Sequence, residues 1–542
     1  MKMYYSGCNL VLTLIVALLC GQSKGIWPFT SVHATPDSQD IVYPDANAKR
    51  VAIIGAGAAG SSTAYYLQQF ASESGLSLNI TVFERSSYVG GRSTTVNAYG
   101  NLLEPVELGA SLFVEANPIL KNSSEALGLK PKESTPETDG GELLGIWDGK
   151  EFVYKQKESG WYYWDVTKLL WKYGLAPIRT QRLVKDVSAK LLKLYEYPFF
   201  PFRSLSDRAL DLGLTPVTSM TGEQFLAANN IGSKFATDII QATTRVNYGQ
   251  NLNLIHGLGS MVCMAVEGAM QIQGGNWQIF AGMLNASNAS TLLNTAVTSI
   301  SKSKSKYSLK TSTTDSLTGN LSTNEESFDT IILAAPLQFS QLALADGLIK
   351  HVPDEIPYVT LHVTLFTSPH AINQTFLNLS PKDEVPSSIL TTLPKDAPLS
   401  EKLEDSVGSP GFFSISTLRT VVNPETLEKE HLYKIFSPKA VTSSFLSEIL
   451  NVHDLTTINS HSPVTWFHPH KWFSYPYLFP RITFEDPELA RGFYYTSGME
   501  SFISTMETSA LMGKNVARLV VDDYLNIFGA GEGEQKVVKG EL

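Results

Sequence analysis

The stretch that decides the fold reads Val51-Ala52-Ile53-Ile54-Gly55-Ala56-Gly57-Ala58-Ala59-Gly60 and continues through Ser61–Phe70. Its four apolar residues fit a buried parallel strand, and the residues after Gly60 fit a helix. A G-x-G-x-x-G spacing between strand and helix is typical of a dinucleotide-binding turn. Gly55 permits the turn, Gly57 lets the backbone approach a pyrophosphate, and Gly60 lets the helix pack closely. The pyrophosphate is then expected at the helix N-terminus, beside Ala58.

A second strand is predicted at Leu78–Phe83, where polar and apolar residues alternate before Glu84. Glu84 lies 24 residues after Gly60, near the spacing at which a carboxylate binds ribose hydroxyls. An acid at this position favours an unphosphorylated ribose, so the pattern predicts FAD or NAD and disfavours NADP. The fold class is therefore α/β with a Rossmann-type domain.

The loop after this strand separates FAD from NAD. Glu84-Arg85 is followed by Val89-Gly90-Gly91-Arg92. Paired glycines allow close backbone approach, and Arg92 offers fixed positive donors to an anionic ligand. This segment resembles the flavin-dependent oxidases that include the amine oxidases, which implies FAD bound by Glu84, Arg85, Gly90, Gly91 and Arg92. Glu107-Leu108-Gly109-Ala110-Ser111 resembles their turn past the flavin ring, which implies cofactor contacts at Gly109 and Ala110.

The same resemblance covers two later parts of the chain. It implies that Val297 lies beside the adenine, and that Gly498 and the backbone of Met506 and Glu507 lie at the flavin or its ribityl chain. We therefore predict a discontinuous FAD-binding domain of the amine-oxidase-like type, made of residues 45–115, 240–340 and 485–542. An inserted α+β substrate-binding domain would take residues 116–239 and 341–484. A chain of 542 residues suits two or three domains.

More specific segments lie outside the glycine motifs. They are Asn247-Tyr248-Gly249-Gln250, Ile255-His256-Gly257, Lys471–Tyr477 and Tyr494–Ala510. Together they resemble the prenylcysteine oxidase family, also called prenylcysteine lyase, from about Val51 to Arg518. The resemblance implies an FAD-dependent thioether oxidase in prenylated-protein degradation, with a prenylcysteine and dioxygen as its small-molecule partners. It would cleave farnesyl- or geranylgeranyl-cysteine to free cysteine, an isoprenoid aldehyde and hydrogen peroxide.

In this chemistry the flavin carries the hard step, while the protein supplies orientation and a dry pocket. The substrate carbon is allylic and bonded to sulfur, so hydride loss needs no strong base. A weak base for the later water attack could be His256, His468, His470 or Glu500, although each residue also has a plain structural interpretation. The catalytic residue therefore stays open, and no metal site is predicted.

Two other functions stay open. One is a different FAD-dependent oxidase, acting on an amine or another lipid, in which Tyr475 and Tyr495 would imitate an aromatic pair facing the flavin. The other is a flavoprotein that binds prenyl lipids without turning them over. Oxygen consumption with amines and with prenylcysteines would separate these alternatives.

The ends and composition of the chain predict export. Lys2 precedes the apolar run Leu10–Leu19, which is typical of a signal peptide over residues 1–24 and short for a membrane span. N-glycosylation patterns occur at Asn79, Asn122, Asn285, Asn288, Asn320, Asn373 and Asn378. A secretory-pathway location follows: vacuole, lysosome or outside the cell, with the endoplasmic reticulum as a further alternative. A net charge of -10 without basic blocks argues against nucleic acid.

Aromatic residues are dense in two parts of the predicted substrate domain. Trp161, Trp164 and Trp171 lie among tyrosines, and a second cluster runs over 195–202. They could line a prenyl channel, contact a membrane peripherally or fill an ordinary core. Cys263 is expected to be a buried thiol without a disulfide partner, because Cys8 and Cys20 leave with the signal peptide.

Overall fold

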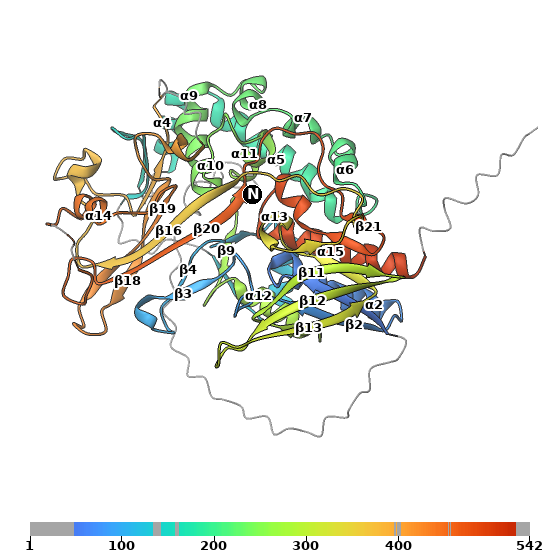
Figure 1. Cartoon of the computed structure of the whole chain (residues 1–542). Helices are drawn as coiled ribbons and strands as arrows, with labels where there is room; N and C mark the ends of the chain where they lie inside the picture. Colours follow the sequence, from blue (N-terminus) through green and yellow to red (C-terminus); the bar gives the residue numbers. More distant parts are fainter. Residues whose placement is uncertain are drawn as a thin grey trace, which may run out of the picture.

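The computed structural model describes residues 48–133, 142–157, 162–394, 397, 403–453, 455 and 457–526. The predicted signal peptide lies outside these residues. Figure 1 shows two sheet-based parts side by side, with a layer of helices along one side of both. The described residues include no helix that is long and apolar enough to cross a membrane.

The first part is built on a six-stranded sheet with the order β10-β2-β1-β14-β22-β21. All neighbouring strands run parallel except β21 and β22. Val51–Ile53 and Ile331–Leu333 are fully buried, as expected for central strands covered on both faces. The α/β, Rossmann-type prediction is confirmed. The strands are β1 (Lys49–Ile54), β2 (Leu78–Phe83), β10 (Ser290–Leu292), β14 (Thr330–Leu333), β21 (Glu488–Ala490) and β22 (Phe493–Tyr495).

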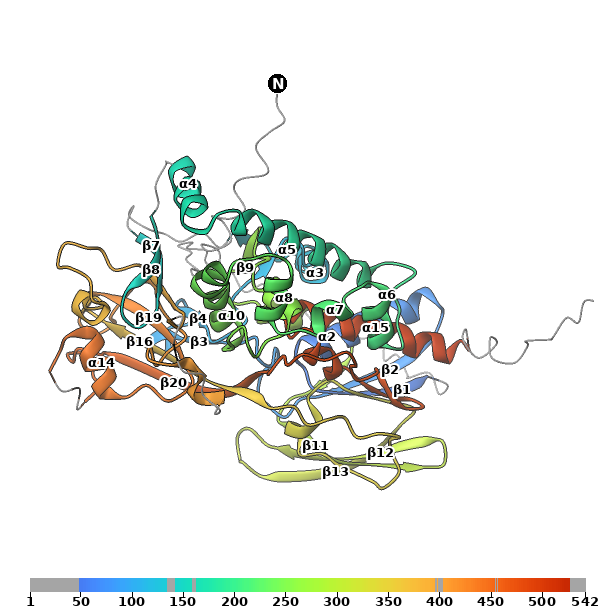
Figure 2. The same cartoon turned by 90° about the horizontal axis from the view of Figure 1, so that it is seen from above.

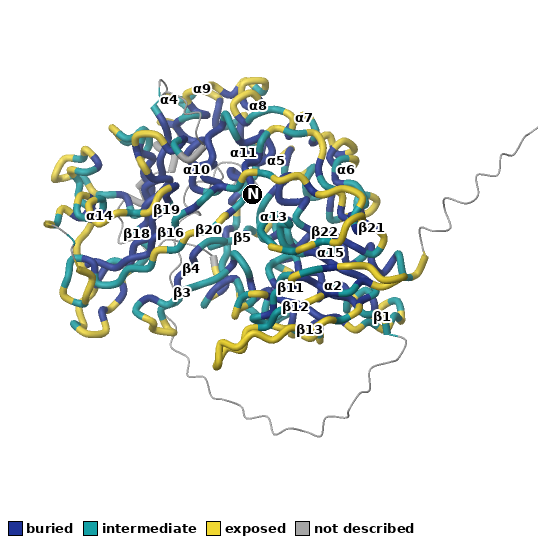
Figure 3. Tube along the Cα trace, in the orientation of Figure 1, coloured by how far each residue is buried: buried dark blue, intermediate teal, exposed yellow. Residues whose placement is uncertain are grey.

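Helices cover one face of this sheet and a second sheet covers the other. On the helical face lie α2 (Ala58–Glu73), α12 (Trp277–Ala286) and α15 (Met506–Tyr524). A Cβ on Gly513 of α15 would lie 2.3 Å from Ala59 O, so the glycine lets α15 and α2 touch. The opposite face packs on a four-stranded sheet, in which β13 is largely exposed (Figure 3). Its strands are β11 (Thr295–Ser303), β12 (Lys306–Thr314), β13 (Leu321–Phe328) and β15 (Ala343–Leu344).

The second part is a seven-stranded sheet with the order β20-β16-β19-β18-β17-β7-β8. Its outer face packs against α14 (Ser443–Leu450). Its inner face packs on the hairpin of β3 (Thr95–Asn97) and β4 (Pro105–Glu107), which links it to the first part. The strands are β7 (Glu142–Trp147), β8 (Phe152–Lys157), β16 (Tyr358–Ser368), β17 (Ser388–Thr391), β18 (Ser414–Val422), β19 (Lys429–Ser437) and β20 (Trp466–Pro476).

A layer of helices joins the two parts along one side (Figure 2). Its core is continuous with the helical face of the six-stranded sheet, so one hydrophobic cluster runs through both. Cys263 is a buried free thiol at the end of α11, as expected. The helices are α3 (Pro118–Ala126), α4 (Tyr162–Tyr173), α5 (Ala176–Leu192), α6 (Leu205–Asp211), α7 (Thr215–Thr218), α8 (Gly222–Ala228), α9 (Ser233–Phe235), α10 (Gln241–Tyr248) and α11 (Gly257–Val262).

A small three-stranded sheet with the order β5-β9-β6 completes this side of the molecule. It contains β5 (Phe113–Val114), β6 (Pro131–Glu133) and β9 (Ala269–Ile272). The proposed domain limits stay a prediction, although α10 and α11 pack with the helical layer.

Candidate cofactor and substrate site

The glycine turn between β1 and α2 has the geometry expected of a dinucleotide loop. Gly55 has φ +107°, and a Cβ on Gly60 would lie 1.9 Å from Gly55 O. No side chain caps the N-terminus of α2, so its first N–H groups, beginning at Ala58, have no capping side chain as acceptor. Such N–H groups at the positive end of a helix dipole are suited to a phosphate.

The paired glycines of the second loop lie directly against this turn. Gly57 and Gly90 form an isolated backbone bridge, and a Cβ on Gly91 would lie 3.3 Å from Gly57 Cα. Gly57, Ala58 and Gly91 stay partly exposed although the strands beside them are buried. The turn and loop therefore form a groove without side chains, which fits the pyrophosphate of a bound dinucleotide.

Glu84 lies beside this groove at the carboxyl end of β2. One carboxylate oxygen accepts from Ala56 N at 2.8 Å, and the other accepts from Ser86 N at 2.8 Å. The start of β11 is tied to the same place, because Thr295 N donates to Glu84 O. Val297 follows within this strand, just before a bulge. Its place next to β2 is compatible with the predicted adenine contact.

The Arg85 side chain turns away from the groove. Its Nη1 donates to Phe339 O at 2.9 Å, in α13 (Leu337–Ser340). Arg92, in the second glycine loop, has other partners. It forms an ion pair of 2.8 Å with Glu500 and donates to Ser474 O at 2.6 Å. Tyr358 OH also donates to Glu500 at 3.1 Å. Arg92 therefore joins the second glycine loop to the C-terminal segment and to β20.

The C-terminal segment lies next to this ion pair. Gly498 is in a short 3₁₀ helix, η6 (Ser497–Ser501), where a Cβ would lie 2.7 Å from Glu485 O. Thr505 caps α15, and the Glu507 carboxylate accepts from Ile119 N and Leu120 N, both at 2.9 Å. Burial raises the pKa of Glu507 to about 7. Its side chain thus holds α3, which leaves only the backbone at Met506 and Glu507 for the predicted cofactor contact.

The turn at 107–111 is strained and clamped from two sides. Ala110 has φ +50°, an uncommon conformation for a residue with a Cβ. Asn276 Nδ2 donates to Ala110 O at 2.8 Å, and Asn276 N donates to Glu107 Oε1 at 2.7 Å. From β19, Lys434 Nζ donates to Glu107 O at 2.7 Å and to Ser111 Oγ at 3.1 Å. Sequence reasoning missed Lys434, because nothing around it in the chain marks a site.

Burial shifts both charged groups of this clamp toward their neutral forms. It raises the pKa of Glu107, and it lowers the pKa of Lys434. The opposite charge of each partner works against these shifts. Next to the turn, a Cβ on Gly109 would lie 2.7 Å from the ring of Trp472 on β20. The glycine therefore lets the first part of the molecule meet the seven-stranded sheet.

Several buried polar atoms of these same segments lack a hydrogen-bond partner among the residues that the structure describes. They are Ser93 Oγ, Trp472 Nε1, Ser474 Oγ and Thr496 Oγ1. Buried polar groups normally have a partner, so this collection points to a bound group with polar edges. Together with the side-chain-free groove, it indicates that the residues fit a dinucleotide cofactor.

The four candidates for a weak base do not meet in one place. His256 is buried, and its Nδ1 accepts from Gly259 N at 3.0 Å as the cap of α11. Burial lowers its pKa to about 4. His468 and His470 lie partly buried on β20, and Glu500 is held by Arg92 and Tyr358. The structure gives His256 and Glu500 supporting positions.

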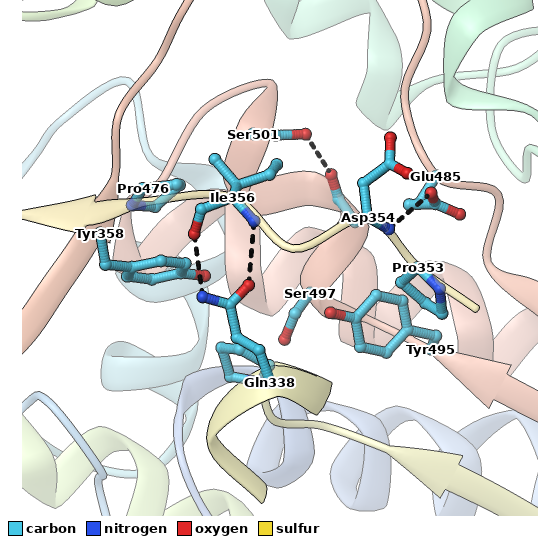
Figure 4. A pocket seen from close by; sticks show the side chains of 12 residues that line it. Gln338, Pro353, Asp354, Ile356, Tyr358, Pro476, Glu485, Tyr495, Ser497 and Ser501 are labelled. Carbon is cyan, nitrogen blue, oxygen red and sulfur yellow. Dashed lines mark hydrogen bonds between the residues drawn. The ribbon is translucent and has the colours of Figure 1, made fainter.

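A pocket borders this C-terminal segment (Figure 4). Tyr358, Tyr495, Gly498 and Ser501 line it, and Gln338 exchanges two hydrogen bonds with the backbone of Ile356. At its rim, potential metal-ligand atoms of His351, Asp354 and Glu485 lie within 4.8 Å of one another, and His351 Nε2 lies 3.1 Å from Glu485 Oε1.

The aromatic clusters divide between surface and core. Trp171 is 91% exposed and Tyr197 is 90% exposed, whereas Phe202 is buried. Tyr173 OH donates to Asp238 at 2.9 Å within the helical layer. The side chains of Trp161 and Trp164 lie outside the described residues. Trp171, Tyr197 and Phe202 thus do not line one channel, and peripheral membrane contact stays a prediction.

Comparison with known proteins gives relatives along nearly the whole chain. "Prenylcysteine oxidase 1" of Homo sapiens is 27% identical over 516 residues, which cover 93% of this chain and 94% of the relative. "Farnesylcysteine lyase" of Arabidopsis thaliana is 28% identical over 492 residues, covering 88% of both chains. "Prenylcysteine oxidase 1" of Rattus norvegicus is 29% identical over 497 residues, covering 88% of this chain and 89% of the relative.

Solved structures show the fold. Cyclohexylamine oxidase from Brevibacterium oxydans has a TM-score of 0.54 at 16% identity, covering 88% of this chain and all of that one. Putrescine oxidase bound to putrescine has a TM-score of 0.52 at 12% identity, covering 87% of this chain and 99% of that one. A model of an NAD(P)-binding Rossmann-like domain matches residues 53–123. The cofactor indicated by this domain and by the oxidase fold is of the flavin type.

The remaining comparison covers most of the chain, from the end of β8 onward. The family model described as prenylcysteine lyase matches residues 156–528, which is more than half of the chain. The match runs from β8 to the end of α15 and so includes Lys434, Trp472, Glu500 and Met506. The chain therefore belongs to the prenylcysteine lyase family.

Proposed function

We propose that this protein is an FAD-dependent thioether oxidase that cleaves farnesyl- or geranylgeranyl-cysteine. One prenylcysteine, one dioxygen and one water would yield free cysteine, an isoprenoid aldehyde and hydrogen peroxide. The observation that carries the proposal is the family match over residues 156–528, joined to a groove that fits a dinucleotide. Relatives named prenylcysteine oxidase and farnesylcysteine lyase support the substrate class.

FAD is proposed as the specific cofactor. The side-chain-free groove of Gly57 and Gly91 would hold its pyrophosphate, and Glu84 would hold the adenosine ribose. Arg92, the 107–111 turn and the N-terminus of α15 would surround its ring system. Bound there, FAD would accept the two electrons of the thioether carbon and pass them to dioxygen.

The protein's own part is to bind, orient and keep out bulk water. Leu361, Val363 and Leu365 present a fully buried apolar inner face of β16 toward the first part of the molecule. A prenyl chain would gain by leaving water for an apolar lining of this kind, beside the β3–β4 hairpin on which these residues pack. Tyr475 packs on Tyr248 with ring centroids 5.2 Å apart, at the junction with α10.

The test is flavin absorbance under anaerobic conditions, with purified protein mixed with farnesylcysteine or with benzylamine. We expect bleaching by farnesylcysteine alone, together with aldehyde and free cysteine in equal amounts. Bleaching by benzylamine alone would move the protein to the amine oxidases. Binding of farnesylcysteine without bleaching would indicate a lipid-binding flavoprotein, and protein that takes up no FAD would contradict the cofactor assignment.

We also propose a secretory-pathway location. The apolar run at Leu10–Leu19 supports it, and six of the seven glycosylation-pattern asparagines are exposed, with Asn373 partly buried. The expected result is a mass loss on treatment with an N-glycan-removing enzyme, and co-fractionation with vacuolar, lysosomal or secreted markers. An unglycosylated protein in the cytosol would overturn this proposal.

A further inference from the structure

A lysine and a glutamate from different parts of the molecule share one buried position. Lys434 lies on β19 and is 7% exposed, and Glu107 lies at the end of β4 with an Oε2 atom that has no solvent contact. The described ion pairs include none between these two side chains. Their charges influence each other nevertheless, because each changes the other's pKa.

Both groups keep unused hydrogen-bonding capacity. An ammonium has three donors, and the described hydrogen bonds of Lys434 use two of them, at Glu107 O and Ser111 Oγ. Its Nζ also lies 4.9 Å from the centroid of the Phe436 ring, a contact that uses no hydrogen-bond acceptor. Glu107 Oε1 accepts from Asn276 N, but Oε2 has no described partner. An unpaired buried carboxylate oxygen is costly, so a site with a spare donor and a spare acceptor indicates a ligand that supplies both.

The surrounding charges favour a ligand with an anionic end. Arg245 on α10 is fully buried and donates only to neutral oxygens, namely Thr391 Oγ1, Asn251 Oδ1, Ser406 O and Val407 O. It stacks over Phe413, and Phe413 N donates to Phe436 O, two residues from Lys434. Arg245 is thus a second buried cation, and its described partners include no carboxylate.

The remaining charged groups facing this place are engaged elsewhere. Arg92 and Glu500 pair with each other at 2.8 Å. Glu430, also on β19, accepts from Tyr99 OH and Asn423 Nδ2. Leu365 on β16 is paired with His468 on β20 and with Lys434 on β19. The side chains of His468 and Lys434 therefore lie in one row on the inner face of the sheet. A burial-lowered pKa keeps His468 mainly neutral at pH 7.

We propose that Glu107 and Lys434 form the subsite for the amino-acid head of the substrate, with Glu107 Oε2 binding the α-ammonium and Lys434 Nζ binding the α-carboxylate. This inference rests on the proposed function, because it assigns recognition of the free cysteine end of a prenylcysteine. It also explains why a titratable pair stands beside a strained turn: the head group anchors the thioether next to Gly109 and Ala110.

The experiment uses S-dodecylcysteine, whose saturated chain lacks the allylic activation needed for oxidation. Its binding to the FAD-loaded protein is measured by calorimetry and compared with its methyl ester and its N-acetyl derivative. In the wild type both derivatives should bind about tenfold to hundredfold more weakly, the range for a hydrogen bond to a charged group. Equal binding of the free amino acid and both derivatives would overturn the proposal without any variant.

Two variants test which residue binds the carboxylate and which binds the ammonium of the amino-acid head group. Lys434→Gln should abolish discrimination against the methyl ester but keep discrimination against the N-acetyl compound, and Glu107→Gln should do the reverse. A purely structural role would weaken all three ligands equally, and that result would count against the subsite. Lys429→Gln, on the exposed part of the same strand, is the matched control and should bind like the wild type.

A charge-retaining change guards against misfolding. Lys434→Arg should keep most of the preference for the free carboxylate if Lys434→Gln fails to fold. If the subsite is right but the proposed function is wrong, the wild type would bind S-dodecylcysteine selectively and would leave farnesylcysteine unoxidised. Oxidation of farnesylcysteine and its methyl ester with equal efficiency would contradict the subsite alone.

Discussion

The six-stranded and seven-stranded sheets contribute to the candidate site in opposite ways. The six-stranded sheet supplies backbone: Gly55, Gly57 and Gly91 are adjacent to its strands and leave a groove without side chains. The seven-stranded sheet supplies side chains, such as Lys434 and Trp472, which project from the middle of strands. A backbone site leaves a readable local motif, whereas a side-chain site on a sheet face leaves scattered residues.

The largest effect is expected from filling the groove. Gly57→Val should abolish FAD binding, because its side chain would occupy the space that faces Gly91 and the pyrophosphate. Flavin absorbance per protein measures the loss, and circular dichroism checks the fold. Gly100→Asn, at φ +71° with no atom within 4 Å of a new Cβ, should keep a full complement of flavin. Retained flavin in Gly57→Val would show that the pyrophosphate does not bind beside Gly57.

The stability of the protein should depend on pH through His256, which caps α11. Burial lowers the pKa of His256 from 6.5 to about 4, so the unfolded state binds the proton more tightly between these values. Stability should therefore fall by about 3 kcal/mol as the pH drops from 6.5 to 4. His256→Asn can still cap α11 and should lose this component. The free energy of unfolding is measured by denaturant titration at several pH values. The same dependence on pH in both proteins would contradict the prediction.

A smaller effect is expected where Arg92 joins the two parts. Glu500→Gln removes one charge of the 2.8 Å pair and should weaken FAD affinity about tenfold, as loss of one charge-assisted contact does. Arg50→Gln removes an ion pair of 2.6 Å with Glu326, away from the groove, and is the control. Unchanged FAD affinity in Glu500→Gln would separate this ion pair from the cofactor site.

The smallest effect belongs to the exposed aromatic cluster. Trp171→Ala should change the free energy of unfolding by less than about 0.5 kcal/mol, because Trp171 is 91% exposed. Trp147→Ala, in the core of the seven-stranded sheet and stacked on Phe412, should cost about 3–5 kcal/mol. Urea titrations of both variants test the contrast. A large cost at Trp171 would mean that it packs on something other than solvent.

The cofactor half of the molecule could be predicted well because its determinants are local. The β1–α2 turn, the second glycine loop and the helix from Met506 all lie where the glycine spacing and periodicity indicated. Within the same half, side-chain directions could not be predicted. The Glu507 carboxylate accepts from backbone N–H groups of α3, and the Arg85 guanidinium donates to a backbone carbonyl of α13.

Sequence alone thus determined the fold class, the flavin-type cofactor and the family resemblance. These depend on backbone conformations that only glycine adopts easily and on the order of strand, turn and helix. Tertiary structure decided that Lys434 meets Glu107, 327 residues earlier in the chain, and that His256 caps a helix. Such contacts follow from strand register and from the packing of one sheet on another, which no short stretch of sequence encodes.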